Sequence, residues 1–439
     1  MADTIKKRPI AFVALVLVVL GFTACSNASP SVTNSGNTDG VYPNKIVVGG
    51  VASLSGVITT DFAPVFQGVQ AYFNMVNSQG GVYGRKIDLA YKLDDASSPS
   101  QDIDQFRALI EDHVFAVVGV ATPSFAGASV VVANGVPTFG MDINTQWNNA
   151  KNLFGENGSY LNFTAPQIEV AYLAQQVHAT KAAVFAYSVA QSQEGCQGAI
   201  NGLKEFGVQI VEQDINIPPP AVDLTADAER AKANGAQLIV SCLDASGNLV
   251  LSQALHQIGL GSVTQYWLDG YDQSYLNNPS DVPLMQGVYF MLQHAPFSVG
   301  QTDPAHYPGM ALYLKELAKY YPGALPSEAS LDGWLNADLF VKGLKLAGPN
   351  PTREKLIKAI NSITSYTAGG ILPPTNWTQA HSSSGMTCVA YVQVQNQQFV
   401  PRFGFDGSVF TCFSPAQKPN SPIIPIGEPG LPGLRSATG

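Results

Sequence analysis

Polar side chains follow the ends of six segments that have the apolar pattern of buried β-strands. Hydroxyl, carboxylate and amide groups in such loops can hold a small polar molecule, because they accept and donate hydrogen bonds from a rigid support. Ligands of open α/β sheets bind outside the carboxyl ends of the strands. We therefore expect one small-molecule site, enclosed between two sheet edges that face each other. The six loops are 53–56, 121–125, 141–145, 187–193, 243–246 and 269–271.

The elements that must position these loops alternate along the chain. Residues 45–141 and 167–293 each repeat a short apolar run followed by a segment with apolar residues at helical spacing. In the first helical segment, 65–78, the pattern stops at Gly80 and Gly81, as a helix end should. This β-α-β rhythm is typical of a parallel, doubly wound sheet. A chain of 439 residues is too long for one core, so two lobes are expected.

The first 24 residues have the pattern of an export signal. A basic stretch, 6–8, precedes an apolar block, 10–20, which is shorter than the about 20 residues that a membrane-spanning helix needs. Small residues then lead to Cys25, as in a secretory signal peptide. Residues 25–44 are rich in Ser, Asn, Thr, Gly and Pro and predict a flexible tether.

Charge and cysteines restrict the class of protein. The formal charge is −9 and no basic stripe is present, which argues against nucleic acid as a partner. Apart from Cys25, the four cysteines form an even set without the Cys-x-x-Cys spacing of zinc sites, and an exported chain can oxidise them. We expect disulfides Cys196–Cys242, within one α/β half, and Cys388–Cys412, across a C-terminal antiparallel unit. Four buried free thiols are the alternative.

Catalytic signatures are missing from the sequence. It contains no Gly-x-Ser-x-Gly elbow, no phosphate loop ending in Gly-Lys-Ser/Thr and no His-Glu-x-x-His. The six histidines have no metal-ligand spacing. We therefore expect no enzyme activity, no metal and no cofactor, and an exported hydrolase is the weakest of the functions considered.

Four stretches carry a resemblance to a known family. They read KIVVGGVASLSG (45–56), NSQGGVYGRKIDLAYKLDDASSP (77–99), FAVVGVATPS (115–124) and GVPTFG (135–140). The chain resembles the periplasmic substrate-binding proteins of the branched-chain amino acid (Leu/Ile/Val) type, which feed ABC importers. The resemblance extends along the whole mature chain in the same order. In the second half it lies in the order of the expected strands and helices more than in the residues themselves.

The resemblance implies the type I periplasmic binding protein fold. This fold has two doubly wound α/β lobes with mostly parallel sheets, joined by three hinge crossovers, here near 161–166, 290–297 and 368–374. The implied domains are an N-terminal lobe (45–163 and 297–370), a C-terminal lobe (164–296 and 371–413) and a Pro/Gly-rich tail (414–439). The residues before Cys25 also resemble a bacterial lipoprotein signal, in which that cysteine is acylated and leads the mature chain. Phe22 departs from the usual smaller aliphatic residue, and plain secretion is the alternative.

The resemblance also indicates site residues. The loop that holds a ligand's α-carboxylate in the family is occupied by Thr122 and Ser124, and the residue that clamps the ammonium falls at Asp269. Asp142 and Asn144 occupy the loop where the family has small residues and a hydroxyl. Because Asp142 would repel a carboxylate, the loop argues against a standard α-amino acid and favours a cationic or amide-bearing ligand. The other expected contacts are Ser55, Tyr187, Gln191, Gln193, Asp244 and Tyr271.

Each of these residues also has a structural alternative. Thr122 and Ser124 could cap the following helix, and Asp142 and Asp269 could belong to turns. We predict a bacterial solute-binding lipoprotein that captures a small polar molecule, such as an amino acid, an amide or a related metabolite, and delivers it to an ABC permease. It should be a monomer, exported and lipid-anchored at the outer face of the cytoplasmic membrane or in the periplasm. The alternative is a ligand-sensing receptor module that signals to a partner protein.

Overall fold

The computed structural model describes residues 36–428 apart from 57–58, 60, 383–386 and 406. The export signal, Cys25 and most of the predicted tether lie outside the described residues. Within the described part of the chain, no helix combines the length and the apolar character needed to cross a membrane.

The first sheet has five parallel strands in the order β2-β1-β3-β4-β5. Alternate residues of β1 enter different cores: Ile46 and Val48 face the helices of one side, and Val47 and Val51 face those of the other. Both faces are therefore covered, which explains the continuous apolar runs of these strands. The strands are β1 (Lys45–Ala52), β2 (Lys86–Asp94), β3 (Ala116–Val120), β4 (Thr138–Gly140) and β5 (Leu153–Phe154).

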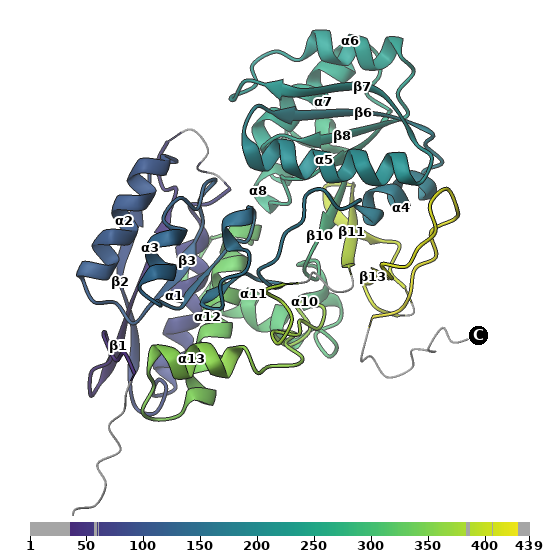
Figure 1. Cartoon of the computed structure of the whole chain (residues 1–439). Helices are drawn as coiled ribbons and strands as arrows, with labels where there is room; N and C mark the ends of the chain where they lie inside the picture. The colour runs from purple at the N-terminus through teal and green to yellow at the C-terminus, as the bar shows by residue number, and fades with distance from the viewer. Residues whose placement is uncertain (1–35, 57–58, 60, 383–386, 406, 429–439) are drawn as a thin grey trace, which may run out of the picture. The chain divides into compact units, whose positions relative to one another are not determined.

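Helices from two distant parts of the chain cover this first sheet (Figure 1). One group follows the first strands and the other comes from residues 299–360. The helices are α1 (Val65–Ser78), α2 (Pro99–Glu111), α3 (Ala128–Ala133), α10 (Val299–Thr302), α11 (Pro308–Tyr320), α12 (Glu328–Ala347) and α13 (Arg353–Ile360), with a 3-10 turn, η1 (Thr145–Trp147).

Helices α1 and α12 approach each other through glycines. A Cβ at Gly68 would lie 1.7 Å from the backbone oxygen of Ser330, and one at Gly333 would lie 1.9 Å from that of Val65. Only glycine fits at such a contact. This contact fixes the N-terminal end of α12, which carries acidic side chains.

The second sheet has the order β12-β11-β10-β9-β8-β6-β7, with β13 paired to β11. Strands β6 to β10 are parallel to one another where they pair, whereas β11 runs antiparallel to β10, β12 and β13. The C-terminal strands, yellow in Figure 1, thus complete a sheet begun by residues 181–292. The strands are β6 (Lys181–Tyr187), β7 (Gln209–Ile217), β8 (Leu238–Cys242), β9 (Thr264–Trp267), β10 (Tyr289–Leu292), β11 (Thr387–Gln395), β12 (Gln398–Arg402) and β13 (Phe410–Phe413).

Helices again cover both faces of the parallel part of this sheet. Residues of α4 and α5 share one core with Ala182 and Val184, and residues of α6 and α7 share another with Ala183 and Phe185. The expected fold class, two α/β lobes with mostly parallel sheets, is confirmed. The helices are α4 (Ile168–Gln176), α5 (Ala190–Glu205), α6 (Thr225–Ala233), α7 (Ala245–Gln257), α8 (Gln273–Leu276) and α9 (Val282–Met285).

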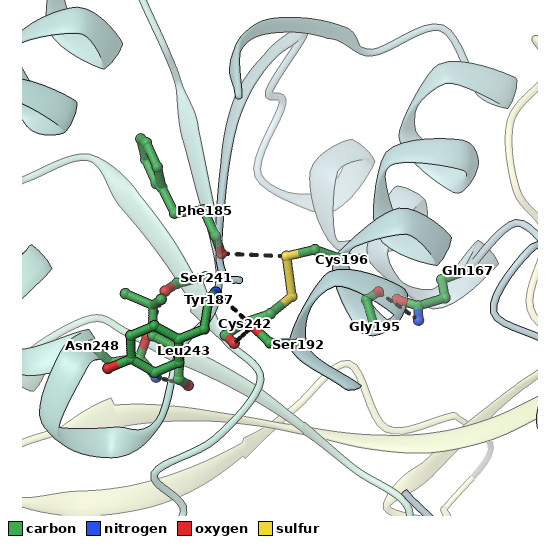
Figure 2. Close-up of a disulfide and its surroundings, with 10 residues drawn as sticks. All are labelled: Gln167, Phe185, Tyr187, Ser192, Gly195, Cys196, Ser241, Cys242, Leu243 and Asn248. Carbon is green, nitrogen blue, oxygen red and sulfur yellow. Dashed lines mark hydrogen bonds between the residues drawn. A yellow bond between two sulfur atoms is a disulfide. The ribbon is translucent and has the colours of Figure 1, made fainter. Parts of the chain in front are cut away.

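The structure contains both expected disulfides. Cys196 on α5 is bonded to Cys242 at the end of β8, and the Cys196 sulfur also contacts the backbone oxygen of Phe185 (Figure 2). Cys388 and Cys412 are bonded as directly opposed residues of β11 and β13. Part of the predicted Pro/Gly-rich tail packs onto this unit, because Ile426 and Cys412 exchange backbone hydrogen bonds.

Candidate functional site

Acidic side chains gather after the carboxyl ends of strands in both sheets. Asp142 follows β4 and Glu156 follows β5, whereas Asp244 and Asp269 follow β8 and β9. Asp61, in the loop after β1, and Glu328 and Asp332, in the first turns of α12, complete the set. We call these seven residues the carboxylate cluster. Parallel strands bring their following loops to one sheet edge, which is why residues this far apart in sequence can act on one another.

The part of the cluster that belongs to the first sheet is Asp142, Glu156 and Asp332. The backbone N–H of Asp142 donates to Oε2 of Glu156 at 3.4 Å. A Cβ at Gly155 would lie 2.4 Å from Cγ of Asp142, so glycine leaves room for this carboxyl group. Burial, followed by the charge of Glu156, raises the pKa of Asp142 and of Asp332 well above their usual range. Burial also raises the pKa of Glu156.

The part that belongs to the second sheet centres on Asp269. Burial first, and then the charge of Asp61, raises the pKa of Asp269 well above its usual range; Glu328 and Asp244 add to this effect. Glu328 raises the pKa of both Asp269 and Asp332, so it links the two parts electrostatically.

His294, just after β10, contacts the cluster with a nitrogen that lacks a hydrogen-bond partner. Its ring is 5% exposed, and Nδ1 lies 2.9 Å from the backbone oxygen of Ala295. A carbonyl oxygen can only accept, so Nδ1 carries a hydrogen; Nε2 is an acceptor in the neutral ring and a donor in the protonated ring. Nε2 makes no hydrogen bond within the described residues and lies 3.4 Å from Oε1 of Glu328.

Asn144 is a second buried polar side chain whose hydrogen-bonding groups have no partner within the described residues. It is 6% exposed, and neither its Oδ1 nor its Nδ2 has a hydrogen-bond partner among the described residues. Buried amides are normally satisfied, and an unsatisfied one in a loop calls for an explanation such as a bound molecule. Asn144 lies two residues after Asp142, in the loop that follows β4.

Several of the expected site residues use their polar groups within the protein. Tyr187 donates its hydroxyl to Oδ1 of Asp244 at 2.6 Å, and the Nε2 of Gln193 donates to the backbone oxygen of Ile215 at 2.8 Å. The hydroxyl of Tyr271, a buried ring, accepts from the backbone N–H of Phe297 at 2.9 Å. These bonds order the loops and the crossover at 297. A direct role of the three residues in ligand binding stays a prediction.

The hydroxyl residues of the first sheet also have local partners. Ser55 donates to Oδ2 of Asp94 at 2.6 Å. The Oγ1 of Thr122 donates to the backbone oxygen of Ser124 at 2.9 Å and accepts its N–H at 3.0 Å, which is the geometry of a turn. Gln191 lies partly exposed in the first turn of α5. The structure thus brings Asp142, Asp244 and Asp269 into one electrostatic group and leaves the hydroxyl residues with structural contacts.

Five residues of this region were not expected from the sequence: Asp61, Glu156, His294, Glu328 and Asp332. Glu156 follows a strand of two residues, too short to recognise by pattern. Glu328 and Asp332 belong to α12. This helix lies beside the first sheet only because the chain returns there after it has formed most of the second sheet. His294 could have been found, because it follows the apolar run 287–293. Within the described residues, no three His, Cys, Asp or Glu side chains are arranged to hold a metal ion.

The family model for periplasmic binding proteins matches residues 45–398. The chain belongs to the periplasmic binding protein family. The match includes the whole first sheet, strands β6 to β11 of the second sheet and every member of the carboxylate cluster.

Relatives with known names agree with this membership. A Leu/Ile/Val-binding protein homologue from Brucella melitensis is 26% identical over 245 residues, which are 51% of this periplasmic binding protein and 64% of the relative. A fatty acid ABC transporter substrate-binding protein from Thermomonospora curvata has a TM-score of 0.67 at 18% identity, covering 83% of this chain and 93% of its own. A solute-binding protein of an ABC transporter from R. palustris, in complex with benzoate, has a TM-score of 0.65 at 20% identity, covering 82% and 95%. At these identities the solved structures establish the shared fold alone.

Proposed function

We propose that this protein is an exported, monomeric solute-binding lipoprotein that holds a small polar molecule between its two lobes and delivers it to an ABC permease. Family membership supports the binding role. The observation that carries the proposal is an approach between elements of the two sheets: Nε2 of His294, just after β10, lies 3.4 Å from Oε1 of Glu328, in the first turn of α12. Glu328 also raises the pKa of Asp269, after β9. A molecule held there would touch both lobes.

Contact with both lobes is what couples binding to closure. A ligand favours one arrangement of a protein only by binding it more tightly than the other. A molecule that bridges Asp142 and Asp269 gains both sets of contacts only when the lobes are together. Closure would then create the surface that a permease recognises.

The cluster also bears on which polar molecule is bound. The ligands named for two of the solved relatives, a fatty acid and benzoate, are carboxylates. Here the loops after β4 and β9 present carboxyl groups of the protein, with pKa values raised by burial and then by neighbouring acidic groups. Negative charges repel each other, so an anionic ligand of that kind is disfavoured.

A thermal-shift screen of the purified protein tests the proposal. The compounds are amino acids, amides, amines, aromatic acids and fatty acids. A specific ligand at 100 times its Kd should stabilise the fold by about 2.7 kcal/mol. Saturable stabilisation by one class, with the compound recovered unchanged, is the expected result. Stabilisation by no class, or conversion of the bound compound, would contradict a solute-binding role.

A further inference from the structure

We infer that one face of the lobe built on the first sheet docks on the membrane surface, with anionic lipid headgroups as its partner. The face consists of residues 42–45, 83–86 and 345–355, and we call it the basic face. It lies where β1 and β2 begin and where α12 is followed by α13. The inference rests on the proposed function, because it adds the orientation in which the anchored protein is held.

Hydrogen bonds join the three segments of the basic face into one surface. Nε of Arg85 donates to the backbone oxygen of Tyr42 at 2.9 Å, and Nη1 of the same side chain donates to that of Pro349 at 2.9 Å. The Tyr83 hydroxyl donates to the backbone oxygen of Lys345 at 2.6 Å. The basic residues of these segments are therefore neighbours in the folded chain, although they are far apart in the sequence.

The first argument is charge. The whole chain has a formal charge of −9, yet the three segments contain six basic residues and one acidic residue, Glu354. Arg353 is buried and lies 3.7 Å from Asp39. Beside the face, Asp88 pairs with Lys45 at 2.9 Å. The basic residues that reach the surface are Lys45, Arg85, Lys86, Lys345 and Lys355. Such a cluster attracts the negative surface of a bilayer that contains anionic lipids.

The second argument is the exposure of large apolar side chains among these charges. Tyr42 is 47% exposed, Tyr83 51% and Leu346 57%. Nζ of Lys45 lies 5.9 Å from the centre of the Tyr42 ring, so basic and aromatic groups alternate on the face. Tyrosine rings are enriched at the level of lipid headgroups, and surface-bound proteins combine apolar side chains with lysine and arginine. The composition of the face therefore fits a membrane surface.

The third argument is the point at which the chain enters the described structure. The backbone N–H of Asn37 donates to both carboxylate oxygens of Glu354, at 3.1 and 3.0 Å, and the N–H of Arg353 donates to the Asn37 oxygen at 2.9 Å. Cys25, the proposed site of the lipid, precedes Gly36 by 11 residues. An extended chain of that length spans at most about 40 Å. A lipid on Cys25 would keep the basic face close to the bilayer, which favours the membrane over an acidic protein as its partner.

Docking on this face would set the direction of the candidate site. Lys45 and Lys86, which oppose each other across β1 and β2, are the first residues of their strands. The loops that carry Asp61 and Asp142 follow the carboxyl ends of β1 and β4, at the other end of the sheet. With the basic face on the bilayer, these loops would point away from it, toward dissolved molecules. The docked state is then one of ligand capture, and delivery to a permease requires the face to be released.

Sedimentation with lipid vesicles tests the inference. The protein is residues 26–439 with both disulfides formed, which keeps every described residue and lacks the basic export signal and Cys25. Vesicles of equal parts phosphatidylglycerol and phosphatidylcholine are compared with vesicles of phosphatidylcholine alone. We expect binding to the anionic vesicles to be at least tenfold tighter in about 50 mM salt and this difference to disappear in about 500 mM salt, where charges are screened. Equal binding to both kinds of vesicle, or binding to neither, would overturn the inference; the second result would leave an acidic protein as the partner of the face.

Charge reversal assigns the binding to the basic face. Lys86→Glu combined with Lys345→Glu should weaken binding to the anionic vesicles at least tenfold. Lys204→Glu combined with Lys232→Glu, on α5 and α6 of the other lobe, changes the net charge equally and should bind like the wild type. If the first pair fails to fold in a thermal melt, Lys355→Glu replaces Lys345→Glu. An equal loss in both pairs, or no loss in the first, would refute the assignment.

Tryptophan fluorescence reports which surface meets the lipid. The four native tryptophans are all buried, so a tryptophan placed on the surface dominates any change on adding vesicles. Leu346→Trp should emit at a shorter wavelength with anionic vesicles. Val222→Trp, at a position that is 85% exposed in the other lobe, is the control and should not change. A shift at both positions, or at 222 alone, would contradict docking through the basic face.

These outcomes are distinct from those that test the proposed function. Lys86→Glu combined with Lys345→Glu should leave stabilisation by a ligand in the thermal-shift screen unchanged. If the vesicles bind nothing while the screen finds a ligand, the basic face is wrong and the solute-binding role stands. If the anionic vesicles bind through the basic face and the screen finds no ligand, the membrane face stands and the solute-binding role fails.

Discussion

The buried residues Asp95 and Asp102 lead us to predict how the free energy of unfolding depends on pH. Both side chains are almost completely buried. Oδ1 of Asp95 accepts from the Ser53 hydroxyl at 2.6 Å and from the Ser97 N–H at 3.0 Å, and Oδ2 of Asp102 accepts from the Gly127 N–H at 2.7 Å. Burial, together with the charge of Asp95, raises the pKa of Asp102 to about 7. Asp102 is thus expected to keep its proton in the folded protein at pH values where a free aspartate has lost it.

The magnitude follows from proton linkage. The pKa of Asp102 rises from 3.8 in the unfolded chain to about 7, so the folded state keeps a proton that the unfolded state releases. The free energy of unfolding should therefore fall as the pH rises from about 4 to 7, by up to about 4 kcal/mol, and level off above that. Asp102→Asn removes this loss, because the amide is neutral at every pH and its Oδ1 can still accept from the Gly127 N–H. We expect the variant to match the wild type near pH 4 and to exceed it at pH 8.

Urea denaturation of the wild type and of Asp102→Asn at pH 4, 5, 6, 7 and 8 measures this difference. Glu169, whose pKa burial raises to about 7, contributes a slope of the same sign to both proteins, so the difference between them is the informative quantity. Asp104→Asn, at an exposed position, should follow the wild type at every pH. Parallel curves for the wild type and Asp102→Asn, or a less stable variant at pH 8, would refute the raised pKa of Asp102.

Three further predictions concern the fold and its anchor. Gly68→Ala should destabilise the protein by about 2 kcal/mol or more in urea, because its Cβ would meet the backbone oxygen of Ser330 at 1.7 Å; an unchanged midpoint would contradict the tight contact of α1 and α12. Replacing both Cys196 and Cys242 by alanine should lower the free energy of unfolding by about 4 kcal/mol, from closure of a loop of 46 residues, in the same assay; a loss below about 1 kcal/mol would contradict this. Cys25→Ser should move the protein from the membrane pellet to the soluble exported fraction, as judged by immunoblotting; an unchanged distribution would exclude the lipid anchor.

The fold could be predicted because its signals are local. Strands that are buried on both faces are continuous apolar runs in the sequence, such as VVGV in β3. Helices are recognised by the spacing of their apolar residues and by the glycines that end them. The two disulfides followed from an even cysteine set and from the placement of Cys388 and Cys412 beside two strand patterns. These features need no knowledge of distant contacts.

The candidate site was only partly predictable because it depends on how distant segments meet. Asp142 and Asp269 could be named, since they directly follow recognisable strands. Glu328 and Asp332 could not, because the glycine contact that holds α12 against α1 joins residues more than 250 positions apart. For Tyr271, the sequence predicts a ligand contact, and the structure adds only that its hydroxyl accepts from the N–H of Phe297, so the ligand contact stays a prediction.

The central claim is that a single small molecule is held by loops from both sheets. A crystal structure of the protein with the tightest-binding compound of the thermal-shift screen tests this most directly. The account predicts density for one molecule within hydrogen-bond distance of Asp142 or Glu156 on one side and of Asp269 on the other. A ligand that contacts only one lobe, or that binds away from these carboxylates, would contradict it.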